Sequence, residues 1–444
     1  MTTVRAVVTQ VSSVCRRWAA ASAWAAKKQS MAPRTLALAA VVLVLTGCGH
    51  SSETHGTTVT ESSTVTSVGT MPGTTTGTTT TAGDGSRGHV RNSHRLVVGA
   101  VEDESKFAPT HAAARADMTR ARDAGFRAIA LSAFWQPPLT RLRPIDRDAL
   151  SRAARAAVAS SITPVVDVAQ FGAHTPLTPA EQTEFASFAA SVPRLVPEIE
   201  HVVVGNEPNT NLFWRPQFDA SGGDAAATAY ESLLARSYDA IKAVAPKVEV
   251  IGGGLAARGA DRPHGKRPTH SPVAFIRDLG AAYRASGRGL PIMDAFSMHV
   301  YGSSPHEPPT LAHPGSTTIG IADYDRLERL LHDALGRTTP IVYGEYGVNT
   351  TVPPDERASY TGTGIASKQP VDARTQARYY TEAIRLAACQ PLVQMLLFFH
   401  VTDEPQLEHF QTGMYYASRT PKPGLAEVAE AAGAAVAGAV PCPR

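Results

Sequence analysis

The chain has 444 residues, 43% of them hydrophobic and 18% charged, which is an ordinary composition for a soluble globular protein. That length could hold two or three domains, or a single barrel domain of roughly 200 to 400 residues. The formal net charge is +3, but the first 47 residues carry six basic and no acidic side chains, so 36 basic and 39 acidic side chains remain beyond them. A mildly acidic body without a basic stripe excludes the electrostatic footprint of a nucleic-acid-binding protein.

The amino-terminal segment has the pattern of an export signal. Basic residues up to Arg34 precede an apolar run over 36–45, which is typical of a secretory signal and too short to span a membrane. The sequence Leu45-Thr46-Gly47-Cys48 resembles a lipobox, which implies that Cys48 is lipidated and tethers the protein to the outer face of a bacterial cell membrane. An ordinary cleaved signal with an incidental cysteine is the alternative. We expect residues 1–47 to be the signal segment, and Met31 could be its true start.

The next stretch lacks the residues that build a core. Residues 51–81 are dominated by Thr, Ser and Gly and contain hardly any large apolar side chain, so they cannot bury enough surface to fold. We therefore expect residues 48–94 to hold the lipidated cysteine and a flexible tether. As a random coil, such a tether would span about 35 to 40 Å.

Strand-like and helix-like segments alternate from residue 95 to the end. The expected strands are 96–101, 126–131, 163–168, 201–206, 248–252, 295–299, 340–345 and 393–399. The expected helices are 111–124, 147–160, 178–192, 224–244, 272–285, 321–335, 373–388 and 425–436. Eight such units predict a single closed (β/α)8 TIM barrel over 95–444, because each short apolar strand suits burial on both faces. An open doubly wound sheet is the alternative, but Gly252-Gly253-Gly254 lacks the spacing of its phosphate fingerprint.

Two of these strands end in a glutamate. The apolar run 201–205 leads into Asn206-Glu207-Pro208, and the run 340–343 leads into Gly344-Glu345-Tyr346-Gly347. A lone glutamate there could merely cap a helix or pair with a surface arginine. A pair is what a retaining glycosidase needs, with one acid to protonate the leaving oxygen and one carboxylate, about 5 Å away, to attack the anomeric carbon. Neighbouring carboxylates also raise one another's proton affinity, so one can stay protonated while the other is ionised.

A third motif, His299-Val300-Tyr301, follows the sixth strand. Together with the two glutamate motifs, in this order, it resembles clan A of the glycoside hydrolases, of the family 5 or family 39 type. The resemblance covers nearly all of 95–444. It implies that Glu207 is the general acid/base and that Glu345 is the nucleophile.

The same resemblance implies roles for three neighbours. Asn206 would hydrogen-bond the sugar hydroxyl next to the anomeric carbon, a contact that strengthens in the transition state. Tyr301 would donate its phenol proton to Glu345, and His299 would supply polar contacts at the floor of the site. Tyr301 alone could equally be a rim aromatic of the core, but His299 lies two residues before it and points to the same side of an extended segment.

Aromatic residues could form the sugar platforms, since apolar sugar faces pack on aromatic rings. The chain departs from the clan at the eighth strand, where many members have a tryptophan and this sequence has Phe399 and His400. Either residue could take that place. Trp135, Trp214 and Tyr346 are further candidate stacking surfaces, with packing in loops as the alternative for each.

Cysteine usage agrees with export. Cys389 and Cys442 are the two cysteines of the predicted domain, and in an extracytoplasmic protein we expect them to form a disulfide. Two unpaired thiols are the alternative, because spacing alone cannot show that the Cα atoms come close enough.

The remaining histidines give no metal-binding pattern. They include His264, His270, His306 and His313, which occur in Pro-rich and Gly-rich loops without regular ligand spacing, so we expect surface-loop positions rather than a metal site. The proposed reaction needs only carboxyls and water, and we expect no cofactor.

The sequence thus predicts a membrane-tethered, monomeric retaining glycoside hydrolase acting on an oligosaccharide or polysaccharide outside the cell. Two alternatives remain open at this point. A barrel could bind glycan without cleaving it, although such a protein has no need for both Glu207 and Glu345. A transglycosylase would share every catalytic residue and differ only in whether a sugar or water resolves the intermediate.

Overall fold

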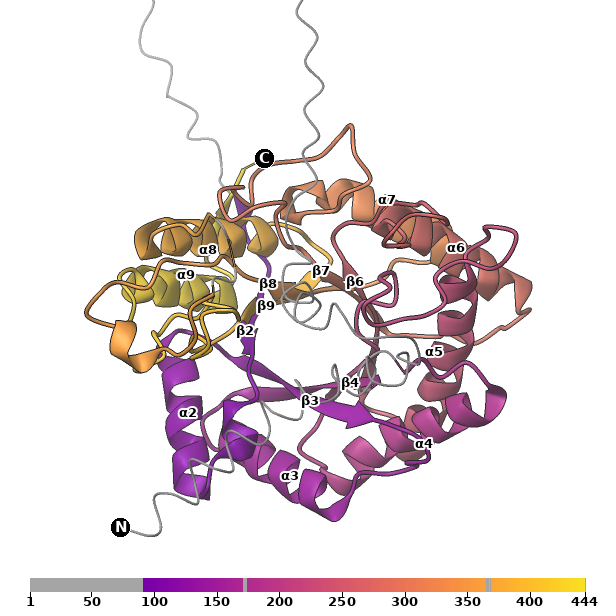
Figure 1. Cartoon of the computed structure of the whole chain (residues 1–444), viewed down its shortest axis with the longest axis horizontal. Helices are drawn as coiled ribbons and strands as arrows, with labels where there is room; N and C mark the ends of the chain where they lie inside the picture. The colour runs from indigo at the N-terminus through magenta and orange to yellow at the C-terminus, as the bar shows by residue number, and fades with distance from the viewer. Residues whose placement is uncertain (1–90, 171–173, 365–366, 368, 444) are drawn as a thin grey trace, which may run out of the picture.

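A closed barrel of eight parallel strands forms the body of the protein (Figure 1). The computed structural model describes residues 91–170, 174–364, 367 and 369–443, so the predicted signal, Cys48 and nearly all of the tether lie outside the described residues. The barrel strands are β2 (Val97–Val101), β3 (Ala128–Trp135), β4 (Thr163–Gln170), β5 (His201–Val204), β6 (Glu249–Ala256), β7 (Ala295–His299), β8 (Ile341–Tyr346) and β9 (Val393–Phe399). Because β9 pairs in parallel with β2, the sheet closes and the predicted TIM barrel is confirmed over an open sheet.

Helices follow the strands and surround the barrel (Figure 1). They are η1 (Glu104–Phe107), α2 (His111–Asp123), α3 (Pro144–Val158), α4 (Pro179–Leu195), α5 (Ala225–Val244), α6 (Pro272–Ala285), η2 (Ile321–Asp323), α7 (Tyr324–Leu335), η3 (Arg357–Ser359), α8 (Ala373–Ala388) and α9 (Leu425–Ala437). Side-chain caps fix several starts, because each satisfies a backbone N–H that has no partner within its helix. Asp224 accepts from the Ala227 amide and Thr178 from the Glu181 amide. None of the described helices is long and apolar enough to cross a membrane.

Two apolar layers hold the barrel together. Inside the barrel, apolar side chains fill the half nearer the amino-terminal ends of the strands. They are Ala128, Ala130, Val165, Val203, Ile251, Ala295, Val342, Met395 and Leu397. The alternate residues of the same strands point outward and pack against the helices in a second, larger cluster. The same alternation, continued toward the carboxyl ends of the strands, places Ser132, Asp167 and His299 inside the barrel. The interior therefore changes from apolar to polar toward the carboxyl ends of the strands.

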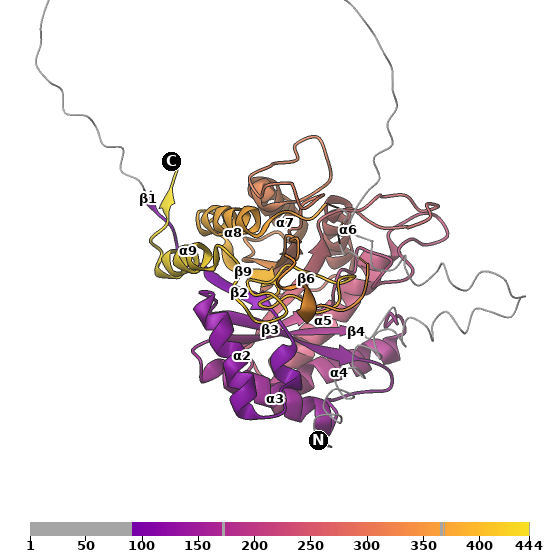
Figure 2. The same ribbon diagram turned by 60° about the vertical axis from the view of Figure 1, so that its left-hand side comes forward.

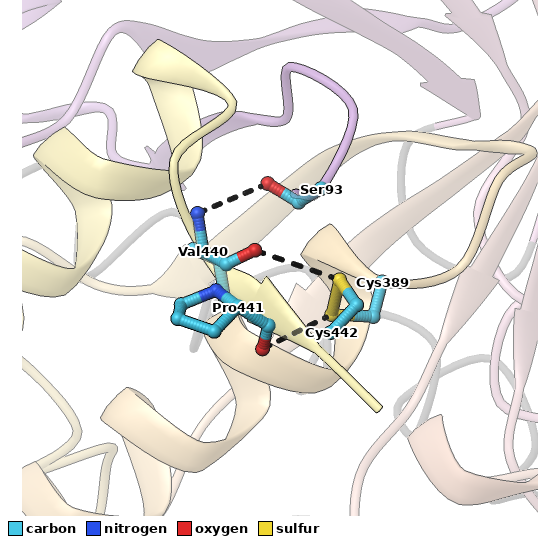
Figure 3. The surroundings of a disulfide bond; sticks show 5 residues. All are labelled: Ser93, Cys389, Val440, Pro441 and Cys442. Atoms are coloured by element: carbon cyan, nitrogen blue, oxygen red, sulfur yellow. Dashed lines mark hydrogen bonds between the residues drawn. A yellow bond between two sulfur atoms is a disulfide. The ribbon is translucent and has the colours of Figure 1, made fainter. Parts of the chain in front are cut away.

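A small two-stranded ribbon lies near the opposite end of the barrel. Strand β1 (Arg91–Asn92) pairs antiparallel with β10 (Pro441–Cys442), beside α9 (Figure 2). The His94 ring bonds the Val393 carbonyl at 2.7 Å, so this ribbon lies at the amino-terminal ends of the strands. The predicted disulfide is present, joining Cys389 at the end of α8 to Cys442 with their Cα atoms 5.5 Å apart (Figure 3).

Candidate active site

The first candidate glutamate lies in a sharp turn directly after β5. Gly205 adopts a left-handed φ of 85°, and Glu207 itself has a φ of 40°. A Cβ on Gly205 would lie 3.0 Å from the Tyr230 ring, so glycine suits both the turn and the packing. The Glu207 amide donates to the Gly254 carbonyl at 2.9 Å, which fixes the turn to β6. A non-glycine residue held in this conformation costs on the order of 1 to 3 kcal/mol, and such strain is concentrated at functional sites.

The second candidate glutamate is turned into the barrel by a bulge in β8. Tyr343 and Tyr346 both belong to the outer core, although strict alternation would place them on opposite faces. The pairing of β8 with β9 shifts register between these same two residues. Bulges of this kind redirect side chains beside active sites, and here the shift lets Glu345 face inward. Gly344 completes the bulge, since a Cβ there would lie only 2.3 Å from the Ser297 hydroxyl oxygen.

One histidine joins the two carboxylates. His299, the last residue of β7, places its Nδ1 atom 3.1 Å from Glu207 Oε1 and 3.6 Å from Glu345 Oε2. The His299 side chain is 6% exposed, and each glutamate side chain is 18% exposed. The phenol of Tyr301 donates a hydrogen bond to Glu345 Oε2 at 2.9 Å. The three motifs thus meet at the carboxyl ends of β5, β7 and β8, where barrel enzymes carry their active sites.

The charges in this group act on one another. Burial alone would lower the pKa of His299, but the charge of Glu345 and the hydrogen bond and charge of Glu207 raise it to about 9, so the imidazole is cationic at neutral pH. Burial raises the pKa of Glu345, and the neighbouring Glu207 carboxylate adds to the rise. The cation of His299 and the Tyr301 hydrogen bond oppose it. The site can therefore hold one carboxylate ionised and a proton on a neighbouring group.

The other predicted contact residues on these strand ends are partly accessible. Asn206 is half-buried and precedes Glu207 in the same turn. Phe399 is half-buried, and its ring lies edge-on to that of Tyr301 with 6.5 Å between centroids. His400 is held by the Val101 carbonyl at 2.8 Å and lies 3.3 Å from Glu404 Oε1. Phe399 is therefore a partly accessible aromatic side chain beside Tyr301.

The prediction that Trp135, Trp214 and Tyr346 stack on sugar is wrong. Their exposed fractions are 0%, 0% and 2%, and all three belong to the core between the barrel and the helices. Trp135 packs edge-on against Phe185 of α4, and Trp214 packs edge-on against Tyr230 of α5. The reason is strand alternation, since β3 continues to residue 135 and points Trp135 outward.

Of the predicted surface histidines, one is buried and another is half-buried. His270 is 2% exposed, and the His313 ring lies between Glu307 and Asp323, with contacts of 2.9 and 2.7 Å. His264 and His306 are exposed, as expected. Loop composition alone therefore did not reveal which loop residues pack inward.

The structure adds Asp167, a carboxylate that the sequence analysis did not select. It lies in β4, between Ser132 of β3 and Val203 of β5 in register. Burial raises the Asp167 pKa to about 7, and the charge of Glu345 adds to the rise. An aspartate in the middle of a mostly apolar strand could have indicated a polar barrel interior.

An ion pair lies on the β3 side of Asp167. Lys106 Nζ lies 2.9 Å from Asp103 and donates to the Ser132 hydroxyl at 2.8 Å. Both charged residues lie in the segment after β2, and no motif or regular spacing in that segment predicted this ion pair.

Comparison with known proteins shows a shared fold. No protein-family model and no curated protein sequence matches this chain. Among solved structures, the chain is similar to a GH5_18 protein from Streptomyces cattleya in complex with GlcNAc, with 17% identity, 77% of this chain and 81% of that chain covered, and a TM-score of 0.51. It is also similar to the exo-β-1,4-mannosidase Op5Man5 from an Opitutaceae bacterium, with 16% identity, 80% and 62% covered, and a TM-score of 0.49.

The chain is also similar in structure to a longer protein, a β-glucuronidase from Bacteroides uniformis. That match has 12% identity, covers 76% of this chain and 34% of that chain, and has a TM-score of 0.47. The chain thus spans only about a third of the length of that protein. These neighbours are glycoside hydrolases, and at such identities the likeness is one of fold.

Proposed function

We propose that the protein is a retaining glycoside hydrolase that cleaves O-glycosidic bonds by double displacement. The observation that carries this proposal is the pair of strand-terminal carboxylates, Glu207 and Glu345, on the same nitrogen of His299. A retaining mechanism uses two neighbouring carboxyl groups, whereas an inverting one leaves room for a water between them. The glycoside hydrolase fold of the structural neighbours agrees with this chemistry.

In the proposed first step, Glu345 attacks the anomeric carbon while the bond to the leaving oxygen breaks. Glu207 gives its proton to that oxygen, and a covalent glycosyl ester forms on Glu345. In the second step, water attacks the anomeric carbon, Glu207 accepts its proton and the ester bond breaks. The sugar leaves with its original anomeric configuration.

The asymmetry of the contacts supports this division of roles. Glu345 accepts the Tyr301 phenol, and a hydrogen bond to the charged form favours the ionised carboxylate that a nucleophile requires. Asn206 would then reach the sugar hydroxyl beside the anomeric carbon, with Phe399 as the aromatic platform and His400 at the rim.

We also propose that the enzyme acts outside the cell as a monomer anchored through Cys48. The lipobox-like sequence and the disulfide both support export, since disulfides persist in oxidising compartments. Residues 91–92 join the body at the amino-terminal ends of the strands, on the side opposite to Glu207 and Glu345. Attachment there would leave the site open to glycans away from the membrane.

Product stereochemistry tests the proposal. With an aryl glycoside that the enzyme cleaves, NMR of the first product should show the anomeric configuration of the substrate. Glu207→Gln and Glu345→Gln should each abolish turnover, whereas retained turnover in Glu345→Gln would contradict the assignment. An inverted first product would overturn the double displacement, and transfer to an added acceptor sugar in preference to water would identify a transglycosylase.

A further inference from the structure

A second polar cluster lies between the amino-terminal end of α5 and the helix α6, which are neighbours in Figure 1. Asp224 caps α5, His270 lies in the loop just before α6, and Asp278 lies on α6 itself. Each offers one ligand atom, and these three atoms all lie within 4.8 Å of one another. The cluster is separate from the catalytic carboxylates, and the proposed reaction does not use it.

The Asp224 carboxylate is buried, and only one of its two oxygens has a hydrogen-bond donor among the described residues. Its side chain is 3% exposed. One oxygen, Oδ1, accepts from the Ala227 amide at 2.7 Å and lies 3.2 Å from His270 Nε2. The other oxygen, Oδ2, is buried and has no hydrogen-bond donor among the described residues. A buried carboxylate oxygen without a donor requires a proton or a cation beside it.

Carboxylates dominate the walls beside the cluster, and the charge of Arg277 acts on Asp278 from the same helix. A surface hollow of about 600 Å³ adjoins the cluster, and its walls include Asp219, Asp224, Glu231 and Asp278. None of the described residues that line this hollow is basic. Burial raises the Asp224 pKa to about 7, and the charge of Asp278 contributes to the rise. A hollow lined by one sign of charge concentrates ions of the opposite sign.

The spacing of the donor atoms matches one metal ion. His270 Nε2 lies 2.9 Å from the Gln217 carbonyl oxygen and 3.2 Å from Asp224 Oδ1. In the tetrahedral geometry typical of zinc, ligand atoms about 2.0 to 2.2 Å from the ion lie roughly 3.3 to 3.6 Å from each other, close to the 3.2 Å between His270 Nε2 and Asp224 Oδ1. An imidazole nitrogen and two carboxylates are a donor set that Zn²⁺ and Mn²⁺ accept, whereas Ca²⁺ takes oxygen ligands.

We propose that Asp224, His270 and Asp278 form a binding site for a divalent cation of the Zn²⁺ or Mn²⁺ type. The neutral imidazole would bind the ion through Nε2, with its proton carried on Nδ1.

The position of the site gives it a structural role. The segment between β5 and α5 carries Glu207 at its start and Asp224 at its end. The His270 amide donates to the Asn209 carbonyl at 2.9 Å, and the Asn209 side chain donates to the His270 carbonyl at 3.0 Å. A cation held by Asp224 and His270 would therefore join the two loops that support the turn of Glu207.

Calorimetric titration of the chelator-treated protein with ZnCl₂, MnCl₂ and CaCl₂ tests this site. We expect saturable binding of Zn²⁺ or Mn²⁺ at one ion per chain. Asp278→Asn should weaken this binding by more than about tenfold, because even loss of a partner that supports a metal ligand costs that much. Asp333→Asn, at an 82% exposed position on α7, is the matched control and should bind as the unmodified protein does.

A second readout separates metal binding from damage to the fold. Asp278 is exposed and its charge repels that of Asp224, so Asp278→Asn should unfold without metal at no lower temperature than the unmodified protein, and the rise in midpoint with metal should be lost. Absence of saturable Zn²⁺ and Mn²⁺ binding, or equal affinity in Asp278→Asn, would overturn the proposal and leave a proton shared by the two aspartates. Binding of Ca²⁺ alone would overturn the role of His270.

Discussion

Four side chains from three strands carry the proposed chemistry, and each has a separate task. Glu207 and Glu345 lie beside His299, and Tyr301 donates a hydrogen bond to Glu345. Burial raises the pKa of Glu345, and the His299 cation and the Tyr301 hydrogen bond oppose that rise.

Tyr301→Phe removes the phenol hydrogen bond without removing the ring. A hydrogen bond to a charged group contributes about 1.5 to 3 kcal/mol, so kcat/KM should fall about 10- to 100-fold. The Tyr301 bond lowers the Glu345 pKa, so its loss raises that pKa and moves the acidic limb of the pH profile to higher pH. A lower rate with an unmoved acidic limb would show that Tyr301 does not act on Glu345.

His299 should make the protein less stable at alkaline pH. Its pKa is about 9 in the folded protein, against 6.5 ordinarily, so the protonated form contributes stability in full below pH 6.5. That contribution disappears as the pH rises through 9, and it amounts to about 3 kcal/mol. The difference in unfolding free energy between the protein and His299→Gln, measured in urea, should shrink by about this amount between pH 6 and pH 10. A difference that is constant over that range would contradict the raised pKa.

At the scale of the element, strand alternation and one bulge decide which residues reach the site. The motifs at residues 206–208, 299–301 and 344–347 could be found in the sequence because they end predicted strands. The side on which Trp135 lies could not be predicted, because the expected strand stopped at 131 and β3 continues to 135. The inward turn of Glu345 depends on a register shift that no local pattern announces.

Truncation of Trp135 should mainly reduce stability, whereas truncation of Phe399 should mainly raise KM. Trp135 is fully buried, so Trp135→Ala should lower the free energy of unfolding by about 3 to 5 kcal/mol. Phe399 is half-buried beside Tyr301, so Phe399→Ala should instead raise KM and cost less stability. Urea unfolding and steady-state kinetics measure both effects. A large KM change in a stably folded Trp135→Phe variant would restore that residue as a platform.

Gly344 should tolerate a side chain only when Ser297 gives way. A Cβ at this position would lie 2.3 Å from the Ser297 hydroxyl oxygen, and the next nearest atoms, on His299, would be 3.4 Å away or more. Gly344→Ala should therefore displace the bulge and greatly reduce kcat. Adding Ser297→Ala should recover much of the loss, because the hydroxyl oxygen of Ser297 has no hydrogen-bond partner among the described residues. No recovery in the double variant would mean that glycine is needed for another reason.

At the level of the whole molecule, the candidate site and the ribbon of β1 and β10 lie at opposite ends of the barrel. The alternation of eight strands and helices was enough to predict a closed barrel, because each unit has its own apolar pattern. Local patterns could not predict contacts between segments that are distant in the sequence. Examples are the ribbon between β1 and β10 and the hydrogen bond from Lys106 to the Ser132 hydroxyl.

The disulfide should stabilise the fold without affecting catalysis. Cys389 and Cys442 are 53 residues apart, and closing a loop of that length in the unfolded chain corresponds to about 4 kcal/mol. The double variant Cys389→Ala/Cys442→Ala should lose up to this much stability, with kcat unchanged because the bond lies at the far end of the barrel. A substantial fall in kcat at a temperature where the variant is folded would contradict this separation.

The most direct test of the account is covalent trapping of the nucleophile. The protein is incubated with a panel of mechanism-based fluorosugars or cyclophellitol-type probes, and the modified peptide is located by mass spectrometry. The account predicts a sugar adduct on Glu345 that is absent in Glu345→Gln, and the reacting probe would indicate the sugar. An adduct on Glu207, on Asp167 or on another carboxylate would contradict the assignment of Glu345 as the nucleophile.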